Sequence, residues 1–244
     1  MLFSSLEFLY LYLPAVLILY YISPLKLRNI VLFAVSLVFY GWGEPVYVFL
    51  MLFSITVSYV SGLLIGKYRD KPRAAKVIVG LTASVTLGVL AFFKYGGFIL
   101  ENLAHIPGLG FLGGYTASIP SLPIGISFYT FQALSYTIDV YRSDGNTLRS
   151  YPAFGAYITL FPQLIAGPII KYKDIEHQLT RRRENAALFS RGIRTFCSGL
   201  AKKVLLANTA GAIWDNVKGY GPDDMTVSLA WFGLIAFAFQ IYIL

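Results

Sequence analysis

Long apolar runs, separated by short charged stretches, dominate the pattern of this chain. A helix that crosses a lipid bilayer needs about 20 consecutive, mostly apolar residues, and uncharged runs near that length recur along the sequence. They cover residues 8–25, 45–66, 77–93, 150–170 and 225–244. The pattern predicts a series of membrane-spanning helices. The first run has no basic segment before it and no small-residue cleavage site after it, so we expect a retained span and not a signal peptide.

Two other uncharged segments extend this prediction. Residues 29–43 form a shorter run that ends at the helix-breaking sequence GWGEP, residues 41–45. Residues 102–138 open with a Gly/Pro-rich loop at 107–114 and become helix-like after Ser118. The predicted fold class is all-α, with about six to eight membrane segments that make residues 1–244 a single polytopic transmembrane domain.

The basic residues predict the orientation, because cytoplasmic loops of membrane proteins carry an excess of Lys and Arg. With the N-terminus outside, all of the 20 Lys and Arg residues except Lys94 and Lys218 fall on the cytoplasmic side. Residues 150–170 then have basic flanks at both ends, Arg149 before them and Lys171 after them. The rule therefore favours a re-entrant segment here over a full crossing.

The sequence after Arg183 has an amphipathic pattern. It predicts a helix at the inner membrane interface, followed by a rise through residues 204–217 and a return in the last span. The apolar face of the amphipathic helix contains Phe189, Ile193, Phe196, Leu200 and Val204, and Arg191, Arg194 and Lys202 lie on other faces.

Small residues recur four apart in two consecutive spans, which allows close approach of helix backbones. We expect the two spans to pack against each other as an antiparallel pair through these rows, and dimerisation through Gly62 and Gly66 is the weaker alternative. The rows are Ser54, Ser58, Gly62 and Gly66 in one span, and Gly80, Ser84 and Gly88 in the next.

Composition supports a membrane protein over a soluble one. Charged residues make up 13% of the chain, against about 25% in soluble domains. The formal net charge of +8 comes from basic residues between apolar runs, so a bilayer explains it and we predict no nucleic-acid partner. A single cysteine, Cys197, excludes an intrachain disulfide and a Cys-rich metal site, and no metal site is predicted.

A polar stripe crosses the apolar stretch that precedes Arg142. Tyr129, Gln132, Tyr136 and Asp139 are three or four residues apart and therefore share one helix face. Such a stripe must face protein or a water-filled cavity in a membrane. The sequence leaves two interpretations open, namely that the stripe lines a cavity or that it only bonds neighbouring helices, with Asp139 paired to Arg142.

The segment 161–170 has two prolines and a glycine in the middle of an apolar run. Proline lacks an N–H group and disfavours helix at the preceding residue, so backbone carbonyls become free at membrane depth. Irregular backbone is tolerated there where it lines a cavity or is buried in protein, and we predict a cavity wall. Its candidate residues are Pro162, Gln163, Gly167 and Pro168.

A basic tract follows this break. Topology explains most of it, and the functional alternative is attraction of an anionic cytosolic ligand, such as a nucleotide-bearing acyl carrier, or of anionic lipid. The candidate donor-binding residues are Lys171, Lys173, Arg181, Arg182 and Arg183. His105 and His177 both fall in predicted loops, and no P-loop, dinucleotide fingerprint, zinc spacing or nucleophile elbow accompanies them.

Three sequence strings resemble the alginate O-acetyltransferase branch of the membrane-bound O-acyltransferase family. They are SLVFYGWGEP at residues 36–45, LPIGISFYTFQALSYTIDVYR at 122–142 and FPQLIAGPIIKYKDIEHQL at 161–179. The resemblance implies a ring of helices around a funnel in the bacterial cytoplasmic (inner) membrane. It also implies acetyl transfer from a cytosolic donor, acetyl-CoA, to a polysaccharide hydroxyl outside, with periplasmic acetylation proteins as partners.

The resemblance covers the N-terminal half of such an enzyme. The catalytic histidine of the family lies in its later half, near a Trp-His-Gly-type motif, so it is expected beyond Leu244 and has no counterpart in His105 or His177. We therefore expect no catalytic residue in this chain and no activity of the chain alone. Gln132, Tyr136 and Gln163 would line the acyl tunnel of the intact enzyme.

Three alternatives remain at this point. Half of a transporter or flippase would share the hydropathy and the broken helices, although the two halves of the chain show no internal repeat. The related branch that transfers D-alanine to teichoic acids would differ in carrier and acceptor. An inactive scaffold of an exopolysaccharide complex would suit a half-length chain.

Overall fold

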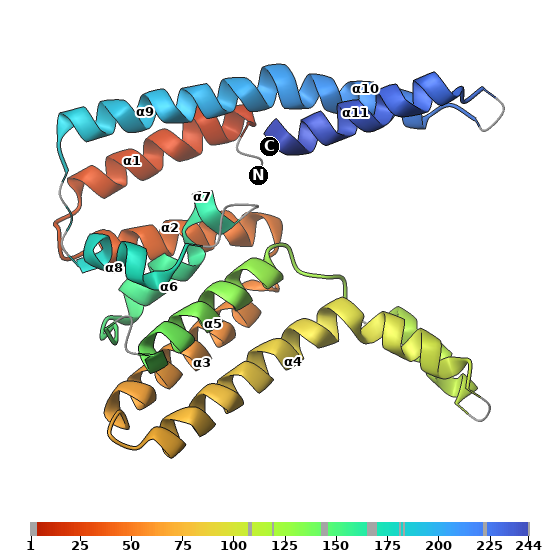
Figure 1. The fold of residues 1–244 in the computed structure, drawn as a ribbon. Coiled ribbons are helices and arrows are strands. Elements are labelled where there is room, and N and C mark those ends of the chain that lie inside the picture. Colours follow the sequence, from red (N-terminus) through yellow and green to blue (C-terminus); the bar gives the residue numbers. More distant parts are fainter. Residues whose placement is uncertain are drawn as a thin grey trace. The chain divides into compact units, whose positions relative to one another are not determined.

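Helices joined by short loops make up the computed structural model of this chain (Figure 1). The model describes residues 4–106, 109–118, 120–142, 146–164, 170–180, 182, 184–221 and 224–243, and these contain no strand. The all-α prediction is confirmed for them. The elements are η1 (Phe8–Tyr12), α1 (Leu13–Ile22), α2 (Arg28–Gly43), α3 (Val48–Lys67), α4 (Pro72–Ala104), η2 (Gly110–Ser118), α5 (Ile126–Arg142), α6 (Tyr151–Thr159), α7 (Phe161–Leu164), α8 (Tyr172–Thr180), α9 (Ala186–Ala201), η3 (Lys202–Ala207), α10 (Asn208–Lys218) and α11 (Val227–Ile243).

Contacts divide the chain into two compact units. The larger unit, Tyr10–Arg182, holds α1 to α8, and α5 lies against α3, α4, α6 and α8 within it. The smaller unit joins Arg183–Leu244 to Leu2–Leu9. Within it α10 and α11 run side by side (Figure 1), and every residue of α9 is at least partly exposed.

Local sequence signals account for several helix starts. Pro72 lies in the first turn of α4, where its missing N–H costs nothing. Ser150 caps α6 by accepting a hydrogen bond from the backbone of Ala153, and Asn185 caps α9 through the backbone of Leu188. Such caps satisfy N–H groups that have no partner inside the helix.

Most of the predicted runs are helical where the sequence places them. The runs at 29–43, 45–66 and 225–244 correspond to α2, α3 and α11, and the amphipathic segment after Arg183 corresponds to α9. The segment 204–217 continues the same helical path through η3 and α10. The run at 150–170 is divided into α6 and α7.

Three predicted boundaries were wrong. The helix expected to end near Lys94 continues to Ala104, because the apolar pattern persists past the lysine, and the loop expected at 107–114 includes part of the helical turn η2. The helix expected soon after Ser118 begins at Ile126. Pro120 and Pro123 delay it, since each disfavours helix at the residue before it.

Two helices of the described part of the chain, α3 and α4, are long and apolar enough to cross a membrane. Three more apolar segments are shorter: Phe8–Ile22, Arg28–Gly43 and Val227–Ile243. Many large apolar side chains on them are exposed, including Ile22 at 78% and Trp231 at 63%. Apolar surface of this kind is what lipid covers in a membrane protein.

The small-residue row of α3 packs against α5 and the segment after it, and not against the matching row of α4 as predicted. A methyl group added to Gly62 would lie 2.5 Å from the ring and hydroxyl of Tyr136, and one added to Gly66 would meet Thr147. In α4, Gly80 and Gly88 have open space around them. The sequence pattern predicted the row of α4 as the partner because it assumed small residues on both sides of the contact. One small residue is enough for close approach when the other side is a flat aromatic ring. Tyr136 and Thr147 of the same chain occupy the space beside Gly62 and Gly66, which disfavours dimerisation through these glycines.

The contact between α3 and α4 uses a neighbouring face. Ser61 of α3 and Thr82 of α4 are both buried, and the Thr82 hydroxyl donates a hydrogen bond of 2.6 Å to the Ser61 hydroxyl. A polar pair satisfied in this way holds two apolar helices in one register.

Gly62→Ala is expected to lower the free energy of unfolding by about 1–3 kcal/mol, because the new methyl group overlaps Tyr136. Gly80→Ala is the matched control, since it adds the same methyl to an open site in the next helix. It should have no cost and gain up to about 1 kcal/mol of helix propensity. Denaturant unfolding of the detergent-purified variants measures both. Equal effects would contradict the α3–α5 packing.

Candidate functional site

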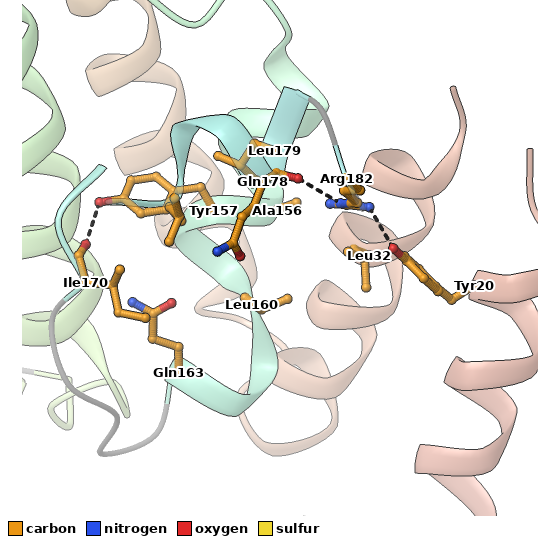
Figure 2. A pocket seen from close by; sticks show the side chains of 11 residues that line it. Tyr20, Leu32, Ala156, Tyr157, Leu160, Gln163, Ile170, Gln178, Leu179 and Arg182 are labelled. Carbon is orange, nitrogen blue, oxygen red and sulfur yellow. Dashed lines mark hydrogen bonds between the residues drawn. The ribbon is translucent and has the colours of Figure 1, made fainter. Parts of the chain in front are cut away.

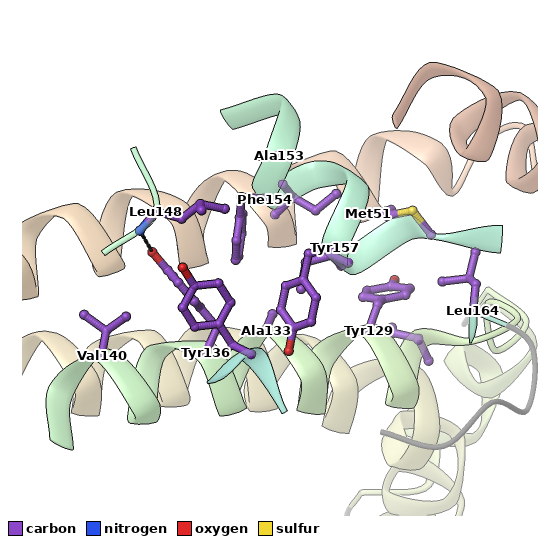
Figure 3. Close-up of a cluster of buried hydrophobic side chains, with 14 of the residues drawn as sticks. Met51, Tyr129, Ala133, Tyr136, Val140, Leu148, Ala153, Phe154, Tyr157 and Leu164 are labelled. Carbon is purple, nitrogen blue, oxygen red and sulfur yellow. Dashed lines mark hydrogen bonds between the residues drawn. The ribbon is translucent and has the colours of Figure 1, made fainter. Parts of the chain in front are cut away.

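The polar stripe of α5 is buried inside the larger unit. Tyr129 and Tyr136 are 0% exposed, Gln132 is 4% exposed, and Asp139 is partly buried. Figure 3 shows Tyr129, Ala133 and Tyr136 projecting from α5 towards Met51 of α3 and Phe154 of α6. The stripe thus faces protein, as a polar row in a membrane must.

Two members of the stripe bind the backbone of neighbouring segments. The Gln132 side-chain amide donates a hydrogen bond of 2.8 Å to the carbonyl of Tyr157, in α6. The hydroxyl of Tyr136 accepts one of 3.2 Å from the amide of Leu148, in the segment that leads into α6 (Figure 3). These bonds give Gln132 and Tyr136 a structural role, because they fix where α6 lies on α5.

Aromatic rings extend this contact to α8. The ring centroid of Tyr136 lies 4.6 Å from that of Phe154 and 4.9 Å from that of Tyr172. Tyr157 also contacts Tyr172, at 5.7 Å. Burial raises the pKa of the Tyr172 phenol, so this group stays neutral at physiological pH and adds no charge to the cluster.

The helix breaks after α6, just before the segment 161–170 for which irregular backbone was predicted. Residues 161–164 of that segment form α7, and residues 165–169 lie outside the described residues. Leu160 separates α6 from α7, and the amide of Phe161 donates a hydrogen bond to the hydroxyl of Ser36 in α2. Gln163 is buried and Pro162 is exposed. Gly167 and Pro168, the other candidates in this segment, lie outside the described residues.

Gly125 brings the turn before α5 onto α7. Its φ is +76°, in the left-handed region that favours glycine. A Cβ atom at this position would lie 3.0 Å from the carbonyl oxygen of Leu164. Glycine is therefore required at position 125 for two reasons: its positive φ, and the close approach of its Cα to the carbonyl oxygen of Leu164.

A cavity of about 280 Å³ opens beside this break (Figure 2). Gln163 and Arg182 are the predicted site residues that line it, whereas Tyr129, Gln132, Tyr136, Asp139 and Pro162 are not part of its lining. Its wall is mostly apolar and comes from α1, α2, α6, α7 and α8. The lining residues are Tyr20, Leu32, Ala156, Tyr157, Leu160, Gln163, Ile170, Ile175, Gln178, Leu179 and Arg182.

Arg182 differs from the other described members of the basic tract, because it is partly buried and held in place. Its guanidinium group donates hydrogen bonds to the carbonyl of Gln178 at 3.1 Å, to the hydroxyl of Tyr20 at 3.3 Å and to the side-chain oxygen of Asn29 (Figure 2 shows the first two). Lys171 and Lys173 are exposed. Arg181 and Arg183 lie outside the described residues.

Among the residues of this site that were not predicted from the sequence, four are polar. Tyr157 supports both neighbouring segments, because its carbonyl accepts from Gln132 and its hydroxyl donates to the carbonyl of Ile170 at 2.9 Å. Gln178 lies one helical turn before Arg182, a spacing that could have indicated their contact. Tyr20 and Asn29 are about 150 residues away in sequence, so no local signal could have identified them.

Neither histidine has the setting of a catalytic base. His105 is exposed, and its Nδ1 is hydrogen-bonded to the backbone carbonyl of Glu101 at 2.8 Å. His177 is exposed on α8. No group of three or more His, Cys, Asp or Glu side chains that could hold a metal ion occurs in the part of the chain that the structure describes.

Tyr136→Phe is expected to cost about 1–3 kcal/mol of stability, because it leaves the buried amide of Leu148 without its acceptor. Tyr129→Phe is the matched control on the same helix. Its buried hydroxyl lies near that of Tyr40 and makes no hydrogen bond of good geometry with a described residue, so its removal should cost less than that of the Tyr136 hydroxyl. Thermal unfolding of both variants in detergent tests this difference, and a larger loss for Tyr129→Phe would refute it.

Relatives of the chain include several named O-acetylases. It is 39% identical over 99% of its length to the probable alginate O-acetylase of Pseudomonas aeruginosa, of which the match covers 46%. It is 37% identical over 99% of its length to that of Azotobacter vinelandii, covering 48%. The peptidoglycan O-acetyltransferase of Helicobacter pylori is 29% identical over 99% of this chain and 51% of its own length. No family model and no solved structure matches the chain.

These similarities agree with the resemblance carried by the three sequence strings. The identity extends along nearly the whole chain and is not confined to one motif. The named relatives and the two long apolar helices together make this a membrane protein. The chain is homologous along nearly its whole length to the alginate O-acetylases, and it spans about half the length of the relatives that it matches.

Proposed function

We propose that this chain is the donor-side half of an O-acetyltransferase that moves an acetyl group across the bacterial cytoplasmic membrane to hydroxyls of a polysaccharide. The observation that carries the proposal is the 39% identity to an alginate O-acetylase over 99% of the chain. A relative named for peptidoglycan is also similar along the whole chain. Both names specify O-acetyl transfer to a glycan polymer, which favours a polysaccharide acceptor over other hydroxyl compounds.

Catalysis of this reaction needs groups that the described residues do not bring together. Acyl transfer to a hydroxyl requires a general base within hydrogen-bond reach of the acceptor and donors for the developing oxyanion. His105 and His177 are both exposed, and exposed imidazoles lack the dry, positioned setting that such a base requires. We therefore expect the catalytic histidine of the whole protein outside these 244 residues, as the resemblance implies, and no activity of the chain alone.

The donor, acetyl-CoA, approaches from the cytoplasm in this proposal. Lys171 and Lys173 are exposed at the start of α8 and are available to attract the negatively charged carrier. Gln163 lines the cavity and is the tunnel candidate that the geometry supports, whereas Gln132 and Tyr136 shape the wall through their backbone hydrogen bonds. Periplasmic proteins would pass the acetyl group on to the acceptor.

A chimera tests the function. The segment of the Pseudomonas aeruginosa alginate O-acetylase that matches this chain is replaced by it, and alginate acetylation is measured in cells without the native protein. We expect the chimera to restore acetylation and the 244-residue chain alone to give none. A chimera that reaches the membrane but leaves alginate unacetylated would contradict the proposal.

The same chimera tests Gln163. Gln163→Ala is expected to lower the acetylation rate about tenfold, because it removes a polar group from the cavity wall. Asn102→Ala is the matched control for loss of an amide, since Asn102 is exposed on α4 and is not among the residues that line the cavity. An unchanged rate for Gln163→Ala would remove this residue from the tunnel.

The single cysteine tests the orientation. Cys197 is exposed on α9, which the proposal places at the cytoplasmic face. A membrane-impermeant maleimide should therefore label it only after the cells are permeabilised. Tyr115→Cys in a Cys197→Ser background should react in intact cells, because Tyr115 is exposed in η2, on the outer side. The reverse labelling pattern would invert the topology.

A further inference from the structure

Arg182 places a permanent positive charge at the cavity, and its hydrogen-bond partners among the described residues are all neutral. Its three hydrogen bonds go to a carbonyl, a hydroxyl and an amide oxygen. A guanidinium group has five N–H donors, so these bonds leave part of its donor capacity unused. Among the described residues, no carboxylate forms an ion pair with it. A partly buried cation in this setting is stabilised by a bound anion.

A second guanidinium group approaches the same place. Arg28 lies 4.9 Å from the ring centroid of Tyr20, and Arg182 lies 5.6 Å from the same centroid. Two like charges that share one aromatic ring repel each other. An anion near Tyr20 would interact favourably with both, which increases the affinity expected of the site.

Arg28 and Arg182 lie near the end of α1, at a position typical of a membrane surface. Tyr20 is in the last turn of α1, and Arg28 is the first residue of α2. Next to them, Ile22 and Leu25 are 78% and 72% exposed. Arginine beside exposed apolar residues at the end of a span is typical of the headgroup level of a bilayer.

The cavity adds room for a thin apolar chain next to the charge. Leu32, Leu160 and Ile175 contribute apolar side chains to its wall, and Arg182 belongs to the same lining. Its volume of about 280 Å³ is just below the usual range for sites that hold a whole drug-sized ligand. The space therefore suits part of one acyl chain and not a whole lipid.

We infer that this cavity binds an anionic phospholipid, with the phosphate at Arg182 and part of an acyl chain between Leu160 and Ile175. The positive charge of Arg182 matches the phosphate, and the apolar wall of the cavity matches the acyl chain. The exposed apolar surface of α1 lets the lipid reach the cavity from the bilayer. The inference concerns a membrane lipid and does not rest on the acetyl-transfer reaction.

Native mass spectrometry of the detergent-purified chain tests the site, with dioleoylphosphatidylglycerol and dioleoylphosphatidylcholine as probes. The anionic lipid is expected to bind about tenfold more tightly than the zwitterionic one, because charge-assisted hydrogen bonds are the strong ones. Arg182→Gln should abolish this preference. Lys67→Gln is the matched control, since it removes one positive charge from an exposed position at the end of α3, and it should keep the preference.

Three results would overturn the inference. The first is equal binding of both lipids by the unmodified chain, and the second is an unchanged preference in Arg182→Gln. The third is displacement of the anionic lipid by coenzyme A at micromolar concentration, which would assign the site to the phosphate of a soluble donor.

A measurement on the unmodified chain covers the case in which Arg182→Gln does not fold. Phosphatidylglycerol with a photoreactive group in its acyl chain is expected to label peptides that contain Leu160 or Ile175. Excess unlabelled phosphatidylglycerol should suppress this labelling, and excess phosphatidylcholine should not. Labelling confined to other peptides would refute the site.

Discussion

The packing of the larger unit depends on the contact between Gly62 of α3 and the side chain of Tyr136 of α5. Because glycine has no side chain, the ring and hydroxyl of Tyr136 approach the α3 backbone directly. The same hydroxyl accepts the amide of Leu148, and the same ring packs on Phe154 and Tyr172. One side chain thereby fixes α3, α5, α6 and α8 together. Any larger residue at position 62 would displace all of these contacts at once.

The arrangement of α6 and α8 then decides what the break after α6 can do. Gln132 holds the last turns of α6 through the Tyr157 carbonyl, and Tyr157 in turn holds the backbone at Ile170. Asn146 binds Glu176 at 2.8 Å and ties α8 to the segment that follows α5. The end of α8 is therefore held near α1 and α2, where Arg182 and Asn29 meet. The cavity is the space that these fixed segments leave open.

The polar residues fall into three groups according to their surroundings in this structure. Groups that complete backbone hydrogen bonds, such as Gln132 and Tyr136, are buried among other helices and stabilise the unit. Groups that line the cavity, such as Gln163 and Arg182, border a space that a ligand can enter. Exposed groups, such as Lys171, meet ligands only by long-range attraction. The three classes were alike in the sequence, where all of them were polar residues near apolar runs.

The sequence by itself determined the helices and the family. Helix class and most helix positions follow from local rules on apolar periodicity, proline and capping, which act over a few residues. Pro162 indicated a helix break, which the structure places two residues earlier, at Leu160. The tertiary structure alone decided which helix covers the Gly62 row, which polar residues reach the cavity, and that Arg182 meets Tyr20 and Asn29. These contacts join residues up to 162 positions apart. Their energies depend on three-dimensional packing, in which a ring can replace a second small residue, so no local pattern encodes them.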